Sequence, residues 1–492
     1  MVKSKDYDLI VGLEVHVQLQ TQSKLFCGCC TSFGAQPNTQ TCPVCTGMPG
    51  ALPVLNRRAL QLAIRTGLAL NCEIATFTKW DRKNYFYPDL PKGYQVSQFD
   101  LPVCGAGYLA ISDPSTRLES RPIRLIRAHL EEDAGKSLHD EAGGLSDTRI
   151  DLNRAGTPLL EIVSEPDIRS PLEAKAFLSE LKLLLGYLGV SDCNMQEGSL
   201  RVDANVNLHV LNDDQLSVAT PIVEVKNLNS FRAVERAVTY EAERQWKLWQ
   251  QDKLTIDQRP KQTRGWNDAE QVTVPQREKE ESADYRYFPD PDLVPVVLTA
   301  DEISEYRADL CELPSEIRLR LQKDYEVSAY DSDVMVNQGR ECVQYFEAVA
   351  KKTNQGKLAA NWIQQHVLQV INDSDCEIEE FPVNVDRLSS LIEKVHAGEL
   401  DNSRAKDVFQ AMLTDPSPLE KVIKALGIEN VADDELETIC RELLEQNPQI
   451  VTDYQGGKKQ AIGSLIGQAK KKNPNANPGR VRELLIQIIE NT

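Results

Sequence analysis

Several short segments place acidic and histidine side chains on one face of a predicted strand. Between residues 8 and 20 the odd positions are apolar, whereas Glu14, His16 and Gln18 occupy even positions between them. Because successive side chains of a strand point to opposite faces, Glu14 and His16 project the same way, about 6 to 7 Å apart along the strand. At that spacing a carboxylate and an imidazole can share a metal ion or a hydrogen-bonded site.

The same alternation recurs farther along the chain. Apolar residues from Leu200 to Leu208 alternate with polar ones that include Asp203, and two valines flank Glu224, with Lys226 following on its face. For any one such strand, a solvated outer face is the simpler interpretation. If the strands pair in one sheet, their carboxylates, amides and imidazoles would form a cradle suited to Mg²⁺ and to the phosphates that it bridges.

Residues 127–133 add a further acidic strand. His129, Glu131 and Asp133 share one face of it, with Glu132 adjacent. The Ala-Gly-Lys-Ser segment that follows at 134–137 ends like a phosphate-binding P-loop, but the position of the first glycine holds a leucine and acidic residues fill the loop. These carboxylates would repel a bare phosphate, so we interpret them as holding a cation that in turn binds phosphate.

Five cysteines lie between residues 27 and 45, and four of them form two close pairs. The pairs Cys27-Gly-Cys29 and Cys42-Pro-Val-Cys45 are separated by a loop that can bring four thiolates around a tetrahedral ion. Cys30 could replace Cys29, and free thiols are the alternative. Because four protein ligands leave no open position, a zinc ion here would be structural, supplying on the order of 10 kcal/mol to the local fold.

Two regions of different character must position these residues. The 492-residue chain exceeds what one hydrophobic core usually supports. Up to about residue 292 it consists mainly of strands and turn clusters, which predicts a largely antiparallel β cradle domain over 1–295 with a zinc loop at 27–45. From about residue 301 apolar residues recur at helical spacing, which predicts a helical linker and bundle over 296–415 and a helical tail over 416–492. The expected fold class is α+β.

The tail combines an apolar stripe with a basic interval. Asn477-Pro478 is typical of an N-cap followed by proline at N1, and it predicts a final helix. The net charge of −19 argues against a generally basic nucleic-acid binder, so any RNA site must be a local patch. A solvated lysine-rich helix surface is the alternative. Between residues 456 and 482 there is no Asp or Glu, and the basic residues there are Lys458, Lys459, Lys470, Lys471, Lys472, Arg480 and Arg482.

Composition places the chain among globular proteins of a reducing compartment. No apolar run approaches the roughly 18 residues of a membrane span, and the start of the chain lacks the apolar core of a signal peptide. Twelve cysteines are too sparse for a secreted disulfide scaffold. We therefore expect a cytoplasmic protein that has no membrane partner.

Seven longer motifs follow one another along the chain: GLEVHV from residue 12, DRKNYFYPD from 81, HLEEDAGKS from 129, DLNRAGTPL from 151, EGSLRVD from 197, VKNLNSF from 225 and DYRYFPD from 284. In this order they resemble the B subunit of the heterotrimeric aspartyl/glutamyl-tRNA(Asn/Gln) amidotransferases, the GatB family. Residues 457–467 are similar to the C-terminal helical domain of that family, so the resemblance runs nearly end to end. The four paired cysteines match its zinc-bearing branch.

The resemblance implies a ligase that forms carbon–nitrogen bonds with glutamine as amido donor. The family uses ATP and Mg²⁺ to phosphorylate the side-chain carboxylate of Glu-tRNA(Gln), and ammonia then displaces the phosphate to give Gln-tRNA(Gln). A glutaminase subunit releases that ammonia from glutamine, and a third, small subunit ties the complex together. The sequence leaves open whether Asp-tRNA(Asn) is also a substrate. We see no glutaminase motif in this chain, in agreement with an external source of ammonia.

The resemblance also implies roles for particular residues. The candidate catalytic residues and Mg²⁺ ligands are Glu14, His16, Glu131 and Glu132, with Asp203 and Glu224 as further ligands. The candidates for contacting phosphate or substrate are Arg82, Lys83 and Lys226, although a surface salt bridge explains each of them equally well. The implied zinc ligands are Cys27, Cys29, Cys42 and Cys45, and the implied tRNA-binding residues are Lys458, Lys459, Lys470, Lys471 and Lys472.

Two other functions fit the residues considered alone. Acidic strands would also suit a Mg²⁺-dependent phosphotransferase or nuclease that acts without partners, and the cysteine loop with the basic tail would suit a non-catalytic, zinc-containing RNA-binding scaffold. ATP hydrolysis that rises with Glu-tRNA(Gln) distinguishes the amidotransferase from both. The nuclease would cleave the tRNA instead, and the scaffold would turn nothing over.

Overall fold

The computed structural model describes residues 6–139, 148–212, 214–276, 284–374, 376–428 and 431–490. The chain separates into two compact units, Met1–Glu316 and Ile317–Thr492. The first is built on β-sheet and the second consists of helices, which confirms the predicted α+β class. The finer boundaries near residues 295 and 415 stay predictions.

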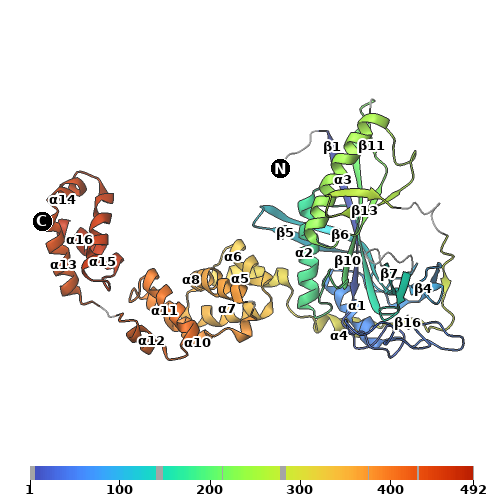
Figure 1. Cartoon of the computed structure of the whole chain (residues 1–492), viewed down its shortest axis with the longest axis horizontal. Coiled ribbons are helices and arrows are strands. Elements are labelled where there is room, and N and C mark those ends of the chain that lie inside the picture. Colours follow the sequence, from blue (N-terminus) through green and yellow to red (C-terminus); the bar gives the residue numbers. More distant parts are fainter. Residues whose placement is uncertain are drawn as a thin grey trace. The chain divides into compact units, whose positions relative to one another are not determined.

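A nine-stranded sheet forms the centre of the first unit (Figure 1). Its order is β14-β13-β12-β10-β1-β9-β6-β5, with β11 also paired to β10, and the β12–β13 pair is parallel whereas the others are antiparallel. The strands are Tyr7–Gln18 (β1), Gly107–Asp113 (β5), Leu118–Glu132 (β6), Pro158–Ser164 (β9), Leu200–Leu211 (β10), Ser217–Ala219 (β11), Val223–Lys226 (β12), Gln262–Asn267 (β13) and Val272–Pro275 (β14). The four strands predicted from alternation are therefore present.

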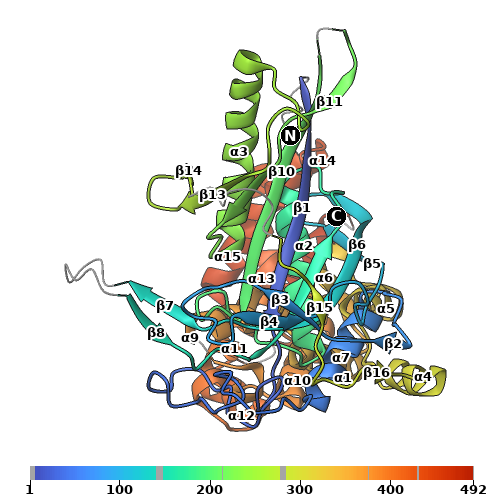
Figure 2. The same cartoon turned by 90° about the vertical axis from the view of Figure 1, so that its right-hand side faces the viewer.

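Helices cover one face of this sheet. They are Arg57–Ala69 (α1), Pro171–Tyr187 (α2) and Phe231–Asp252 (α3), capped by the side chains of Asn56, Ser170 and Ser230. In Figure 2, α2 lies behind β1 and β10. The apolar residues of β1 pack with those of the helices in one hydrophobic cluster. Because burial stabilises this apolar face, the alternating polar residues are fixed on the opposite face.

Smaller elements complete the first unit. One small sheet has the order β15-β3-β4, and it crosses in front of the large sheet in Figure 2, on the face opposite α2. Lys136 and Ser137 begin a strand rather than a helix, so the segment lacks the helix that follows a P-loop. The strands and the helix are Phe77–Thr78 (β2), Asp81–Asn84 (β3), Tyr94–Ser97 (β4), Lys136–His139 (β7), Thr148–Asp151 (β8), Phe288–Pro289 (β15), Val296–Val297 (β16) and Ala300–Ala308 (α4).

The second unit is helical, and helix α5 crosses the boundary into it. Its last four helices share a hydrophobic cluster of their own. As predicted, Asn477 caps the final helix, since its side chain accepts a hydrogen bond from the N–H of Gly479 at 2.9 Å. The helices are Pro314–Tyr325 (α5), Ala329–Asn337 (α6), Arg340–Thr353 (α7), Gly356–Trp362 (α8), the π-helix Ile363–Val367, Leu368–Ser374 (α9), Val385–His396 (α10), Asn402–Thr414 (α11), Leu419–Ala425 (α12), Asp433–Gln446 (α13), Pro448–Gln455 (α14), Gly463–Lys472 (α15) and Pro478–Glu490 (α16).

Among the described residues, no helix has both the length and the apolar character needed to cross a membrane.

Candidate active site

Four neighbouring strands place polar side chains in one row across the sheet. The register aligns His16 of β1 with Arg201 of β10 on one side and with Glu161 of β9 on the other, and it aligns Glu161 with His129 of β6. Aligned residues of paired strands project to the same face. This face is the one opposite the helices, so four polar groups meet where no apolar core covers them.

The neighbouring rows add carboxylates to this face. On one side, Asp203 of β10 is aligned with Glu14 of β1. On the other side, Glu131 of β6 and Gln18 of β1 are both aligned with Leu159 of β9, the strand between theirs. The acidic faces that alternation predicted on separate strands therefore belong to one sheet, as the predicted cradle requires.

Three residues of these rows form a compact group, which we call the histidine group: His16, Glu131 and Glu161. The His16 Nε2 atom lies 3.4 Å from Glu161 Oε2 and 3.8 Å from Glu131 Oε1. His129 lies beside the group, with its Nε2 atom 3.5 Å from Glu161 Oε2. Segments far apart in the sequence thus bring two imidazoles and two carboxylates together.

The histidine group has strong internal electrostatics. Burial alone would lower the pKa of His16, but the hydrogen bond with Glu161 and the negative charges of Glu161 and Glu131 raise it above its ordinary value. Burial would likewise raise the pKa of Glu161, yet the hydrogen bond with His16 and the charge of His129 hold it well below the ordinary value. Glu161 is therefore an anion at neutral pH and is available as a metal ligand.

A second group, which we call the carboxylate group, consists of Glu14, Asp203 and Glu224. Asn205 donates a hydrogen bond to Glu14 Oε1 at 2.9 Å and so fixes the orientation of that carboxylate. Lys226 forms ion pairs with both Asp203 and Glu224. Burial would lower the pKa of Lys226, but these two carboxylates raise it, so the side chain is a cation.

Both groups fit a divalent cation. Within each group, the potential ligand atoms lie within 4.8 Å of one another. At this spacing, one central ion can contact all three side chains after small movements. Carboxylate oxygens are the ligands that Mg²⁺ prefers, and an imidazole nitrogen adds affinity for transition metals. In addition, Asn205 Oδ1 is buried and has no hydrogen-bond partner among the described residues. An oxygen of this kind beside three carboxylates can accept from a water molecule bound to a cation.

Glu132 does not belong to either group. It points to the side opposite Glu131, where it pairs with Lys92 and accepts a hydrogen bond from the N–H of Val96 at 3.2 Å. The carboxylate that completes the histidine group is instead Glu161, which the sequence-based prediction missed. The available signal was a single acidic residue within the apolar strand Pro158–Ser164. It lies two residues after the end of the DLNRAGTPL segment.

The three basic candidates lie in different surroundings. Arg82 is held by Asp290, at 2.8 Å from Oδ2, and by Asp292, at 3.0 Å, so it ties β3 to the segment after β15. Lys83 projects to the other face of β3, where burial would lower its pKa but the negative charge of Glu131, together with other nearby groups, raises it. Lys83 and the Lys226 described above thus lie close to acidic residues of the two groups, whereas Arg82 is engaged in ion pairs elsewhere.

A cavity of about 570 Å³ adjoins the carboxylate group. Asp203, Lys226 and Arg201 line one side of it, and residues 31–35 of the cysteine loop line another. A volume of roughly 300 to 1,000 Å³ is typical of sites for small molecules and cofactors. The cavity can therefore hold a nucleotide or an aminoacyl end next to the acidic residues.

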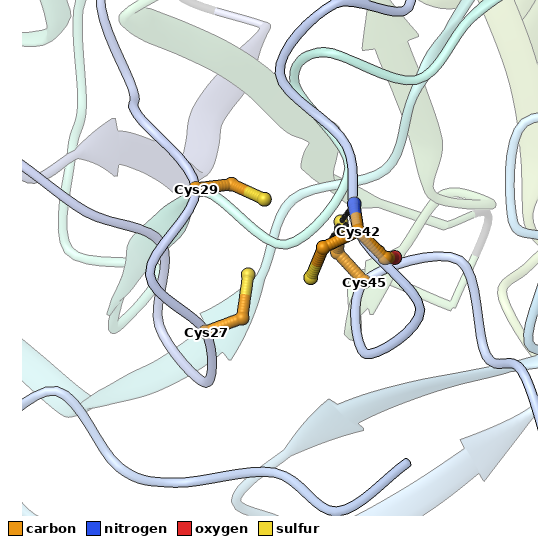
Figure 3. Close-up of side chains that lie close together, drawn as sticks. All are labelled: Cys27, Cys29, Cys42 and Cys45. Atoms are coloured by element: carbon orange, nitrogen blue, oxygen red, sulfur yellow. Dashed lines mark hydrogen bonds between the residues drawn. The ribbon is translucent and has the colours of Figure 1, made fainter.

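The four paired cysteines converge from two arms of the loop. Figure 3 shows Cys27 and Cys29 on one side, facing Cys42 and Cys45 on the other. All four sulfur atoms lie within 4.8 Å of one another, and the Sγ atoms of Cys42 and Cys45 are 3.9 Å apart. Sulfur atoms at tetrahedral positions about 2.3 Å from zinc are roughly 3.8 Å apart, so the set fits that ion. Cys30 is exposed and contacts Ser32 instead.

Hydrogen bonds connect the cysteine loop to the segment that leads into β9. The side chain of Asn38 accepts from the N–H of Leu152 at 2.8 Å and donates to the carbonyl of Ile150 at 2.9 Å. Asn153 accepts from the N–H of Gln40 at 2.8 Å. The loop that carries one wall of the cavity is thus joined to the strand that carries Glu161.

The basic interval of the tail is partly neutralised. Lys459 and Lys471 are exposed and have no ion-pair partner in the part of the chain that the structure describes. Arg482 is likewise exposed and has no ion pair among the described residues, so any contact of this interval with phosphates would depend most on these three residues. The other three predicted lysines form ion pairs, Lys458 with Asp453, Lys470 with Asp401 and Lys472 with Glu442.

Comparison with known proteins reveals close relatives. Residues 9–304 match the model of the GatB/GatE catalytic domain, and residues 344–489 match that of the GatB domain. The chain is 60% identical to a protein of Rhodopirellula baltica named as the B subunit of aspartyl/glutamyl-tRNA(Asn/Gln) amidotransferase, over 98% of this chain and 96% of the relative. Proteins of the same name from Caldanaerobacter subterraneus and Thermodesulfovibrio yellowstonii are 45% and 44% identical, with at least 97% of each chain covered.

Proposed function

The chain belongs to the GatB family, that of the B subunit of the aspartyl/glutamyl-tRNA(Asn/Gln) amidotransferases, and we propose that it activates and amidates the amino acid of a mischarged tRNA. As a family member it is one subunit of a glutamine-hydrolysing ligase that forms carbon–nitrogen bonds. The proposed substrate is Glu-tRNA(Gln) and the product Gln-tRNA(Gln). The relatives' name adds Asp-tRNA(Asn) and Asn-tRNA(Asn) as a second pair.

The proposed reaction follows from the low reactivity of a carboxylate toward ammonia, since direct substitution would have to expel oxide. First, a carboxylate oxygen of the substrate attacks the γ-phosphorus of ATP, which forms an acyl phosphate and releases ADP. Ammonia then attacks the carbonyl carbon, loses a proton, and phosphate departs with the former carboxylate oxygen. Both steps build up negative charge, so a site that performs them needs cations.

The chain's own residues supply or hold those cations. We propose that the histidine group and the carboxylate group each bind a Mg²⁺ ion; when bound, Mg²⁺ supplies positive charge that stabilises phosphate oxygens and the developing oxyanion. His16 must be neutral to offer its nitrogen. Asn205 keeps Glu14 in place, while the ammonium groups of Lys226 and Lys83 add positive charge beside the acidic residues and can contact phosphate or the substrate.

The observation that supports this proposal most strongly is the convergence of both groups on one sheet face beside a cavity of suitable size. Five strand segments separated by up to about 200 residues contribute to it. A solvated outer face would not need two sets of carboxylates packed against one another, because like charges at that distance repel.

Ammonia, a zinc ion and two further subunits complete the proposal. The glutaminase subunit would supply ammonia from glutamine, and the small subunit would hold the complex together. The four paired cysteines would hold a structural Zn²⁺, which fixes the loop that borders the cavity.

The complex with the glutaminase and small subunits tests the function directly. With glutamine and Glu-tRNA(Gln), we expect Gln-tRNA(Gln) to form only in the presence of ATP and Mg²⁺, and we expect ATP hydrolysis to rise when Glu-tRNA(Gln) is added. A complex with Glu14→Gln and His16→Ala should bind the tRNA but not amidate it. Cleavage of the tRNA would favour the nuclease, and tRNA binding without turnover would favour the scaffold.

The tail gives a prediction about tRNA binding. Because Lys459 and Lys471 are exposed and unpaired in the described part of the chain, changing both to Glu should weaken tRNA binding and reduce the slope of log K against log salt by about 0.7 to 0.9 per lost phosphate contact. Titrations at several salt concentrations measure this slope. The double substitution Lys247→Glu and Lys351→Glu is the matched control, since these two lysines are also exposed, have no ion pair among the described residues and lie outside the tail. A slope unchanged by the double substitution in the tail would contradict the proposed role.

A further inference from the structure

Lys24 is completely buried although its side chain normally carries a charge. Its exposed fraction is 0%, and its Nζ atom lies 3.3 Å from the carbonyl oxygen of Leu152 and 3.5 Å from Cys45 Sγ. Within the described part of the chain, no ion pair joins Lys24 to a carboxylate. The carboxylate of Glu132, which lies in the same region, forms its ion pair with Lys92 instead. Burial of an ammonium group without a counter-charge is unfavourable, so its position calls for an anion.

The cysteine cluster offers that anion. Four thiolates outweigh the charge of one divalent ion, so a zinc centre with four cysteine ligands is negative. Cys45, the ligand nearest to Lys24 in the structure, is itself buried, so solvent does not screen the interaction. Cys45 Sγ also accepts a hydrogen bond from the N–H of Cys42 at 3.2 Å, another contact that favours negative charge on this sulfur.

We propose that Lys24 is a positioning residue that neutralises part of the charge of the zinc centre and joins that centre to the strand carrying Glu161. The second part of the proposal depends on the contact with Leu152, because the chain runs from there through Thr157 directly into β9. The inference rests on the zinc ion of the proposed function. In addition to the four cysteine ligands, the affinity for zinc would then depend on Lys24, which does not bind the ion itself.

The test compares zinc affinity in the whole complex carrying Lys24→Met with that of the unchanged complex. Methionine keeps the apolar length of the side chain but removes the charge. We expect the affinity for zinc, measured by competition with a chelator, to fall roughly 10- to 100-fold, as is typical when a contact to a metal ligand is lost. Substituting Co²⁺ for zinc should show a shifted sulfur-to-cobalt charge-transfer band, which a purely structural loss would leave unchanged.

Lys92→Met is the matched control. It removes another mostly buried lysine of the same region, one that pairs with a carboxylate rather than with a cysteine. This variant should be less stable but should bind zinc as before. If Lys24→Met does not fold, Lys24→Gln takes its place, because glutamine keeps a donor for the Leu152 carbonyl without the charge, and we expect the same loss of zinc affinity.

The outcomes separate this inference from the proposed zinc ion itself. An unchanged complex that contains no zinc by elemental analysis, and binds none, would overturn the zinc ion and the inference together. An unchanged complex that binds zinc, with Lys24→Met and Lys24→Gln binding it equally tightly, would overturn only the role of Lys24. Loss of affinity in both Lys24 variants, with Lys92→Met unaffected, would support it.

Discussion

Replacing Glu131 with Gln is expected to reduce the rate of amidation by at least about 10²- to 10³-fold, whereas Glu132→Gln should leave the rate per folded molecule nearly unchanged. The two residues are neighbours on β6 but point to opposite sides. Glu131 belongs to the histidine group, and Glu132 forms a buried ion pair with Lys92. Glutamine keeps the shape of either side chain, so the comparison isolates the carboxylate charge.

The two variants should also differ in stability. Removing one partner of a buried ion pair typically costs roughly 3–5 kcal/mol, so Glu132→Gln should unfold at lower denaturant concentration than the unchanged protein. Glu131→Gln removes a carboxylate that lies near Glu161 but also near His16 and Lys83, so repulsion and attraction partly offset each other and the loss of stability should be smaller. Initial rates of Gln-tRNA(Gln) formation, normalised to the folded fraction, measure the first effect. Equal activity losses in the two variants would argue against the histidine group as the site.

Changing Cys42 to Ser is expected to remove zinc from the protein and to disorder the loop from residue 27 to residue 45. Binding of zinc supplies on the order of 10 kcal/mol to such a loop, more than the hydrogen bonds of Asn38 and Asn153 can replace. Because residues 31–35 line the cavity, the KM for Glu-tRNA(Gln) should rise at least roughly tenfold, a difference of about 1.4 kcal/mol. Elemental analysis, amide hydrogen exchange and steady-state kinetics measure the three effects.

Cys30→Ser provides the matched control for this prediction. Cys30 follows Cys29 in the chain, but it is exposed and its sulfur faces Ser32. The variant should keep its zinc, its amide protection and its KM. A protein in which Cys30→Ser loses zinc while Cys29→Ser keeps it would show that the other cysteine is the ligand.

The faces of the strands could be predicted from the sequence, but their order in the sheet could not. Alternation alone assigns Glu14 and His16 to one face, because the period of a strand is two residues. Which strands pair depends on contacts between residues up to about 200 positions apart, such as the alignment of His16 with Arg201. Glu161 was missed for a related reason: its strand is apolar except for this residue and the terminal Ser164, so it showed no alternating polar face to recognise.

The predicted roles of charged residues depended on partners that the sequence does not reveal. Glu132 and Arg82 occur in motifs rich in such residues, yet their ion pairs with Lys92 and Asp290 are set by tertiary contacts. By contrast, the cysteine cluster follows from local spacing, because two short turns suffice to bring each pair together. The α+β class was predictable as well, since the change from strand to helix periodicity extends over long segments.

The proposed activation step is tested most directly by following the oxygens of the substrate. Glu-tRNA(Gln) labelled with ¹⁸O in its side-chain carboxylate is incubated with the complex of this chain and the glutaminase and small subunits, together with glutamine, ATP and Mg²⁺. If the carboxylate is phosphorylated before it is amidated, each Gln-tRNA(Gln) formed should be accompanied by one phosphate that carries ¹⁸O. Phosphate without ¹⁸O, or amidation in the absence of ATP, would contradict the proposed mechanism.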